Sequence, residues 1–106
     1  MMGIENVKLM DAGVVKLPEG LSGNPAEAEA AVKDAATKAF PRRRLRFNSS
    51  EGRLIINAST FFVEEFITAE FDGEYVVFRE GGIRNFSSGA NGVAKIISIL
   101  KHYEKA

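Results

Sequence analysis

Cysteine and tryptophan are absent from this chain of 106 residues, and proline occurs only three times. Without cysteine, no disulfide stabilises the fold and no thiol can act as a nucleophile or metal ligand. No apolar run approaches the roughly 20 residues that span a bilayer, and Glu5, Asn6 and Lys8 stand where a signal peptide needs an apolar core. We therefore expect a cytoplasmic protein without membrane contact.

A net charge is also absent, because 14 basic and 14 acidic residues cancel. Neutrality argues against a protein that coats nucleic acid, for which strongly basic domains are the rule. The charges are nevertheless unevenly spread, since residues 38–53 contain Lys38 and five arginines but Glu51 as their one acidic residue. A local basic patch is therefore expected on a chain whose 45% hydrophobic content is that of an ordinary folded domain.

Two segments have the pattern of helices. The first is residues 25–40, where Asn24 suits the N-cap, Pro25 the first helical position, and Glu27 completes a capping box. Its alanine-rich stripe predicts close packing against a sheet and consists of Ala28, Ala31, Val32, Ala35, Ala39 and Phe40. The second helix is expected at about residues 90–105, with an apolar stripe of Val93, Ile96, Ile97, Leu100 and Tyr103.

The N-terminal segment and the arginine-rich segment both predict β-structure. A small hairpin is expected around Asp11-Ala12-Gly13, with Val7, Leu9, Val15 and Leu17 as its inward residues. Residues 42–59 predict two strands around a polar turn at 48–52. Alternation in the first of these strands places Leu45 and Phe47 on one face, and on the other face it places Arg42, Arg44 and Arg46.

Residues 61–71 fit a helix or a strand, and the hairpin signal after them favours a strand with a bend near Glu64 and Glu65. Asp72-Gly73 predicts a type I′ turn that pairs Ile67 with Phe78, and the same register gives the pairs Thr68 with Val77, Ala69 with Val76 and Glu70 with Tyr75. The element order predicts an α+β fold in one domain over residues 1–106. It consists of an antiparallel sheet of four to six strands, with both helices packed on one face.

The segment GGIRNFSSGANG, residues 81–92, has the composition of a phosphate-binding loop or of a simple corner. It lacks the lysine of a P-loop, and it follows an antiparallel hairpin rather than the first strand of a βαβ unit. Gly89 and Gly92 have the G-x-x-G spacing with which KH domains grip a nucleic-acid backbone, but neither the preceding helix nor basic residues between the glycines are present. We interpret this segment first as a simple connecting loop, and second as an anion-binding site at a helix N-terminus.

The arginine-rich segment is the second candidate site. Its guanidinium groups suit contacts with phosphates. Phe40 and Phe47 lie close to these arginines in the sequence and could stack on the bases of a nucleic acid. The alternative is cross-strand ion pairing with Glu64, Glu65, Glu70 or Glu74. Single-stranded nucleic-acid binding is therefore the alternative function, with phosphate and backbone contacts from Arg42, Arg43, Arg44, Arg46, Arg53, Gly89 and Gly92.

Groups suited to catalysis are sparse. His102 is the single histidine and falls in the last turn of the second expected helix. Glu64 and Glu65 are adjacent, so on a strand their carboxylates point to opposite faces. We therefore expect no catalytic residue, no metal ligand, no cofactor and no small-molecule substrate.

Aromatic residues, in contrast, are numerous, with eight Phe and two Tyr. Phe61 and Phe62 are consecutive, so a strand would expose one of them, and Phe86 has no periodic role in its Gly/Ser-rich segment. Exposed aromatic side chains are typical anchors of protein interfaces. The preferred interpretation is a non-catalytic binding or regulatory module that contacts a protein partner or a second copy of itself through Phe61, Phe62 and Phe86.

Overall fold

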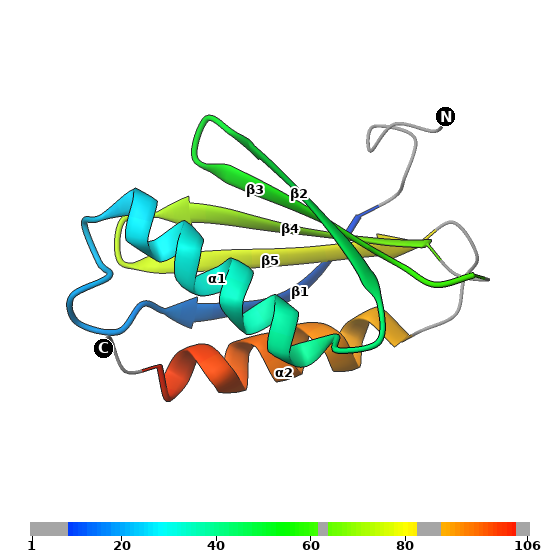
Figure 1. Cartoon of the computed structure of the whole chain (residues 1–106). Coiled ribbons are helices and arrows are strands. Elements are labelled where there is room, and N and C mark those ends of the chain that lie inside the picture. Colours follow the sequence, from blue (N-terminus) through cyan, green and yellow to red (C-terminus); the bar gives the residue numbers. More distant parts are fainter. Residues whose placement is uncertain (1–8, 62–63, 83–87, 104–106) are drawn as a thin grey trace.

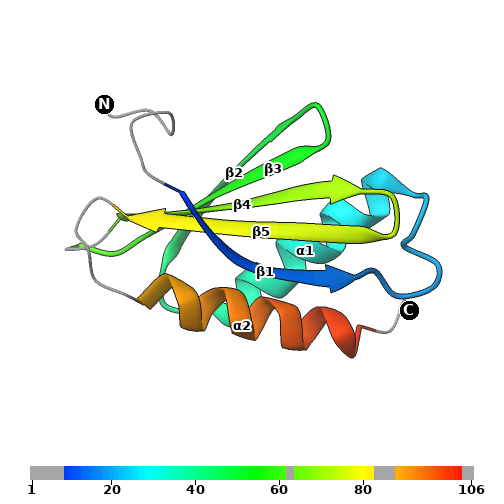
Figure 2. The same cartoon turned by 180° about the vertical axis from the view of Figure 1, so that it is seen from behind.

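The computed structural model describes residues 9–61, 64–82 and 88–103, so Phe62 and Phe86 lie outside it. Five strands form one antiparallel sheet in the order β1-β5-β4-β3-β2, and two helices cover the same face of it (Figures 1 and 2). The predicted α+β fold is confirmed. The elements are β1 (Met10–Lys16), α1 (Pro25–Ala39), β2 (Arg44–Ser50), β3 (Arg53–Ser59), β4 (Glu64–Asp72), β5 (Tyr75–Gly82) and α2 (Ser88–Lys101).

Helix α1 begins as its sequence predicts. Pro25 is its first residue, and the Asn24 side chain accepts a hydrogen bond of 3.4 Å from the Glu27 backbone N–H. Every residue of the predicted alanine-rich stripe is buried, and Ala36 joins them. These small side chains let α1 pack closely against α2.

Helix α2 begins at Ser88 and ends at Lys101, slightly earlier than expected at both ends. Val93, Ile96 and Leu100 are buried, while Lys95 and Lys101 face solvent, as the predicted stripe requires. In the described part of the chain, no helix combines the length and the apolar character that crossing a bilayer requires.

The N-terminal hairpin prediction is wrong, because residues 10–16 form the single strand β1 at one edge of the sheet. Asp11 pairs with Arg79 and Gly13 pairs with Phe78, so Ala12 is the extra residue of a β-bulge. A Cβ at Gly13 would lie 2.6 Å from Ile97 Cδ1, so a larger residue here would require the Ile97 side chain of α2 to shift. The residues predicted to turn the chain instead bend one continuous strand.

The two hairpins differ in how well the sequence predicts them. The β2–β3 turn is confined to Glu51 and Gly52, with φ of 44° and 77° as a type I′ turn requires. In the β4–β5 hairpin, Asp72 pairs with Tyr75, so the turn is Gly73-Glu74 rather than the predicted Asp72-Gly73. The reason is that Gly73, with φ of 59°, takes the first turn position.

The predicted β4–β5 register is therefore wrong by two residues. Ile67 pairs with Glu80 instead of Phe78, and Glu70 pairs with Val77 instead of Tyr75; likewise Thr68 pairs with Arg79 and Ala69 with Phe78. A slip of two residues leaves every side chain on its predicted face, because side chains alternate with a period of two. The hydrophobic pattern alone could not detect it.

The core lies between the sheet and the two helices. It contains the fully buried side chains Leu54, Ile56, Ile67, Ala69, Val76 and Phe78 on the helix-covered face of the strands. No helix in the described ranges covers the opposite face, which Figure 2 shows in front. We call these the covered face and the uncovered face.

Candidate docking surface

The centre of the uncovered face carries a charge cluster. The Arg79 guanidinium donates hydrogen bonds to Asp11 Oδ1 at 3.1 Å and to Glu70 Oε1 at 2.7 Å. The hydrogen bond and the charge of Glu70, followed by those of Asp11, raise the pKa of Arg79. The Arg79 guanidinium therefore stays charged and has two carboxylate partners within the molecule.

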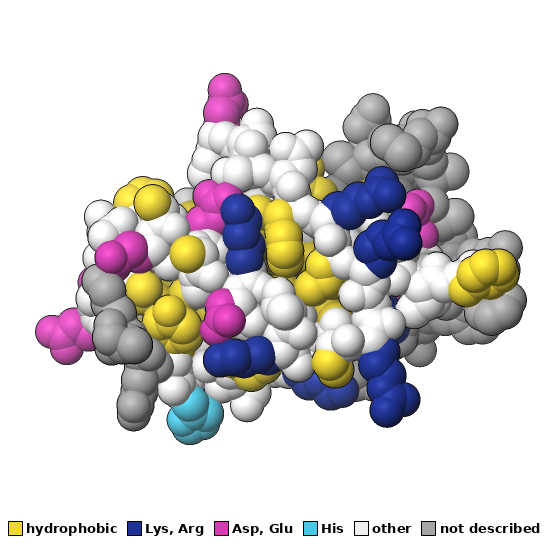
Figure 3. Space-filling view, viewed as in Figure 1, with side chains coloured by type: hydrophobic (Ala, Val, Ile, Leu, Met, Phe, Trp, Pro, Cys, Tyr) yellow, Lys and Arg dark blue, Asp and Glu magenta, His cyan; other side chains and the backbone are white. Residues whose placement is uncertain are grey.

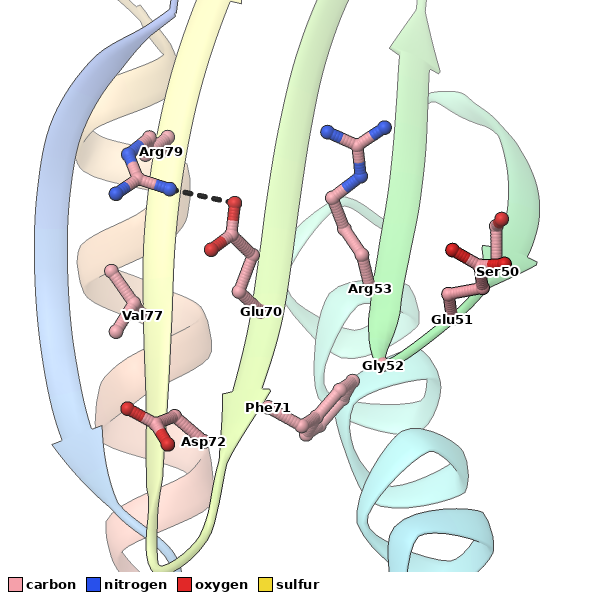
Figure 4. A pocket seen from close by; sticks show the side chains of 9 residues that line it. All are labelled: Ser50, Glu51, Gly52, Arg53, Glu70, Phe71, Asp72, Val77 and Arg79. Carbon is pink, nitrogen blue, oxygen red and sulfur yellow. Dashed lines mark hydrogen bonds and ion pairs between the residues drawn. The ribbon is translucent and has the colours of Figure 1, made fainter.

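A hollow of about 630 Å³ lies where the two hairpin turns end this face (Figure 4). Arg53 and Glu70 face each other in register across β3 and β4, and Asp72 adds a further carboxylate. Small-molecule sites usually have enclosed and largely apolar walls. This hollow is open and lined by charges of both signs, so its shape does not suggest a substrate pocket.

The five candidate arginines do not lie together. Arg44 and Arg46 are exposed on β2 and form no ion pair with the described residues. Arg53 lies on β3 on the same face, whereas Arg42 belongs to the turn before β2 and not to the strand face that was predicted for it. Arg43 turns inward, where it pairs with the buried Glu65, so one of the expected ion pairs with the acidic residues is present.

The predicted base-stacking rings are not available beside these arginines. Phe40 is buried, and the guanidinium of Arg43 lies over its ring at 5.0 Å. Phe47 is half-buried on the covered side, with Lys33 Nζ 5.8 Å from its ring centre. Both rings therefore serve packing between the helices and the sheet.

Gly89 and Gly92, the predicted backbone clamp, both belong to the first part of α2 and not to a loop. Packing explains the glycine at position 92, since a Cβ there would overlap the ring of Phe40. The G-x-x-G spacing thus reflects, at its second glycine, a contact between the start of α2 and the residue after α1.

One corner joins residues from both functional hypotheses. Phe61, an expected protein contact, is 95% exposed just beyond the end of β3. Arg44, an expected phosphate contact, pairs in register with Ser59 and lines a hollow of about 330 Å³ together with Ser59, Thr60 and Phe61. We call this the Arg44–Phe61 corner.

The outer edge of β2 adjoins this corner. β2 ends the sheet, so within the described ranges no strand pairs with its outer side. Helix α1 fixes the strand from the covered side, because Lys33 lies over Phe47 and Ser49 Oγ donates a 2.9 Å hydrogen bond to Glu29 Oε2. The result is an ordered row of backbone groups available for pairing.

Two acids on the covered face, the buried Glu65 and the half-buried Glu80, were not predicted to lie there. Glu65 is 2% exposed, and Glu80 has one carboxylate oxygen that is buried without a hydrogen-bond partner among the described residues. Burial, and secondarily the charge of Glu65, raise the pKa of Glu80. Their alternation with Ile67 and Phe78 was the available signal, because it places both acids on the core side of their strands.

His102 follows the end of α2 and is exposed, as expected for a helix terminus. No group of three or more His, Asp or Glu side chains within the described ranges could hold a metal ion. Comparison of the chain with family models, with curated proteins and with solved structures finds no match.

Proposed function

We propose that the protein is a non-catalytic binding module that docks a protein partner at the Arg44–Phe61 corner and the adjoining β2 edge. The observation that carries this proposal is the 95% exposure of Phe61 beside an arginine that forms no ion pair with the described residues. Aromatic and arginine side chains are the residues most often found at the energetic centre of protein interfaces.

The surroundings of the corner support the same function. Phe61 lies two residues beyond the end of β3 at Ser59, and Arg44, which pairs with Ser59, begins β2, so the sheet positions the Arg44 backbone at this corner. A preorganised site loses little conformational entropy when it binds. The neutral net charge suits a protein partner better than a polyanion.

Affinity capture from a cell extract with quantitative mass spectrometry tests the proposal. Proteins bound by the wild type should be lost from Phe61→Ala and reduced in Arg44→Ala. Tyr75→Ala is the matched control, because Tyr75 is also an exposed aromatic residue but lies at the far side of the sheet. Identical sets of captured proteins from all variants would contradict docking at this corner.

Single-stranded nucleic acid is the second candidate partner. The observation that favours it is the exposure of Arg44 and Arg46 on one face of β2 without ion pairs among the described residues. Anisotropy of a labelled mixed-sequence oligonucleotide measures such binding. If it occurs, Arg44→Glu with Arg46→Glu abolishes it, and the wild-type affinity falls with salt by a log–log slope of about 0.7 for each phosphate contacted.

A further inference from the structure

We infer that the outer edge of β2 pairs antiparallel with the β2 edge of a second copy of this chain, which makes one continuous sheet across two molecules. The inference rests on the proposed function, in that it treats the protein as a binding module. It adds the identity of one partner and the strand that receives it.

The two edges of the sheet are not equivalent, and β2 is the one suited to pairing. Its register with β3 runs from Arg44 opposite Ser59 to Ser50 opposite Arg53 without interruption. β1 carries the bulge at Asp11–Gly13, and α2 packs along it (Figure 1). Bulges and covering elements are the usual means by which proteins block pairing at a sheet edge.

A two-fold axis through Phe47 gives the pairing that uses the whole strand. In this register Phe47 lies opposite its own copy, Arg46 opposite Asn48, and Arg44 opposite Ser50. Centring the pair on Arg46 would instead place two guanidinium groups directly opposite each other, which is destabilising. The half-buried Phe47 side chains on the covered side would bury their remaining surface against each other.

The distribution of charge along β2 fits an antiparallel pair. Basic side chains gather where α1 ends and β2 begins, toward the right of Figure 3, and Glu51 lies at the opposite, hairpin end of the strand. Antiparallel pairing places the basic start of one strand beside the Glu51 end of its partner. In an antiparallel β2–β2 dimer, the charges at the two ends of the paired strands are therefore complementary.

Sedimentation velocity over a range of protein concentrations tests the inference. The wild type should form a dimer, and Asn48→Arg should weaken it by about tenfold or more, because it places like charges opposite each other twice in the symmetric pair. The exchange variant Arg46→Asn with Asn48→Arg should restore the dimer, since each strand again places one arginine opposite one asparagine. Circular dichroism of each variant establishes that it folds.

Val14→Arg is the matched control, because Val14 is 60% exposed on β1 at the other edge and the change adds the same charge. It should leave the dimer unchanged. A monomer at every concentration, or a dimer that Asn48→Arg leaves intact, would overturn the inference. A dimer lost in Val14→Arg but not in Asn48→Arg would also overturn it, while the proposed role in protein binding would still stand on its own capture experiment.

Discussion

The two faces of the sheet are built from alternate residues of the same strands but meet different demands. On β3, Ile56 is fully buried beneath the helices, while its neighbour Ile55 is half-buried on the uncovered face. The covered face holds the core and tolerates two acids only at the end near Arg43. The uncovered face carries the charge cluster in which Arg79 is bound between Asp11 and Glu70, and it also includes the buried side chains of Phe66 and Thr68. Neighbouring residues of one strand thus lie in different environments.

The same substitution on each face should give the largest contrast. Ile56→Ala removes a side chain from the core and should lower the free energy of unfolding by about 3 kcal/mol through lost burial and a residual cavity. Ile55→Ala, the matched control on the uncovered face, should cost about 1 kcal/mol or less. Urea denaturation measures both values. Equal losses would mean that something else covers the second face as fully as the helices cover the first.

A smaller effect is expected where the helix layer is most closely packed. Gly92→Ala would ordinarily stabilise a helix by about 1 kcal/mol. Here the added Cβ overlaps the Phe40 ring, so we expect a net destabilisation of about 1–2 kcal/mol from overpacking.

Thermal and urea denaturation of a double-mutant cycle with Phe40→Leu isolates this contact. The penalty of Gly92→Ala should shrink when the smaller side chain is present, because the clash is then relieved. If Gly92→Ala destabilises the protein equally with and without Phe40→Leu, the loss of stability comes from the backbone of α2 and not from the contact with Phe40.

The smallest effect concerns Glu80 on the covered face. The raised pKa of Glu80 means that the stability this group contributes is fully present below the pKa of the unfolded chain and is lost as the pH rises through the folded pKa. Glu80→Gln should therefore be more stable than the wild type at neutral pH, and its advantage should vanish as the pH falls toward the ordinary pKa of glutamate. Melting temperatures of the wild type and of Glu80→Gln measured across that pH range test this prediction, and an advantage of Glu80→Gln that does not change with pH would contradict it.

The covered face was largely predictable from sequence, because it depends on local patterns. The Asn24-Pro25 start of α1, its alanine stripe and the apolar stripe of α2 all follow from helical periodicity and capping. The same alternation that buries Leu54 and Ile56 placed Arg44 and Arg46 on the outer side of the sheet. Periodicity therefore predicted which side chains face the helices.

The errors arose where backbone geometry depends on a distant partner. The sequence pattern predicts a turn at Gly13, but this residue lies in β1, where a Cβ would come 2.6 Å from Ile97 Cδ1 of α2. The pattern likewise predicts a loop at Gly92, whereas this residue lies in α2, where the lack of a side chain leaves room for the Phe40 ring. The juxtaposition of Phe61 with Arg44 also depends on tertiary structure, since it follows from the β2–β3 register and not from any motif.

The bulge in β1 has a consequence for the size of any assembly. A sheet with two regular edges can add copies at both ends without limit, which is the route to fibres. This chain offers one regular edge, and pairing through it consumes that edge in both molecules. The dimer inferred above would therefore be self-limiting, because the irregularity around Gly13 leaves no second regular edge among the described residues.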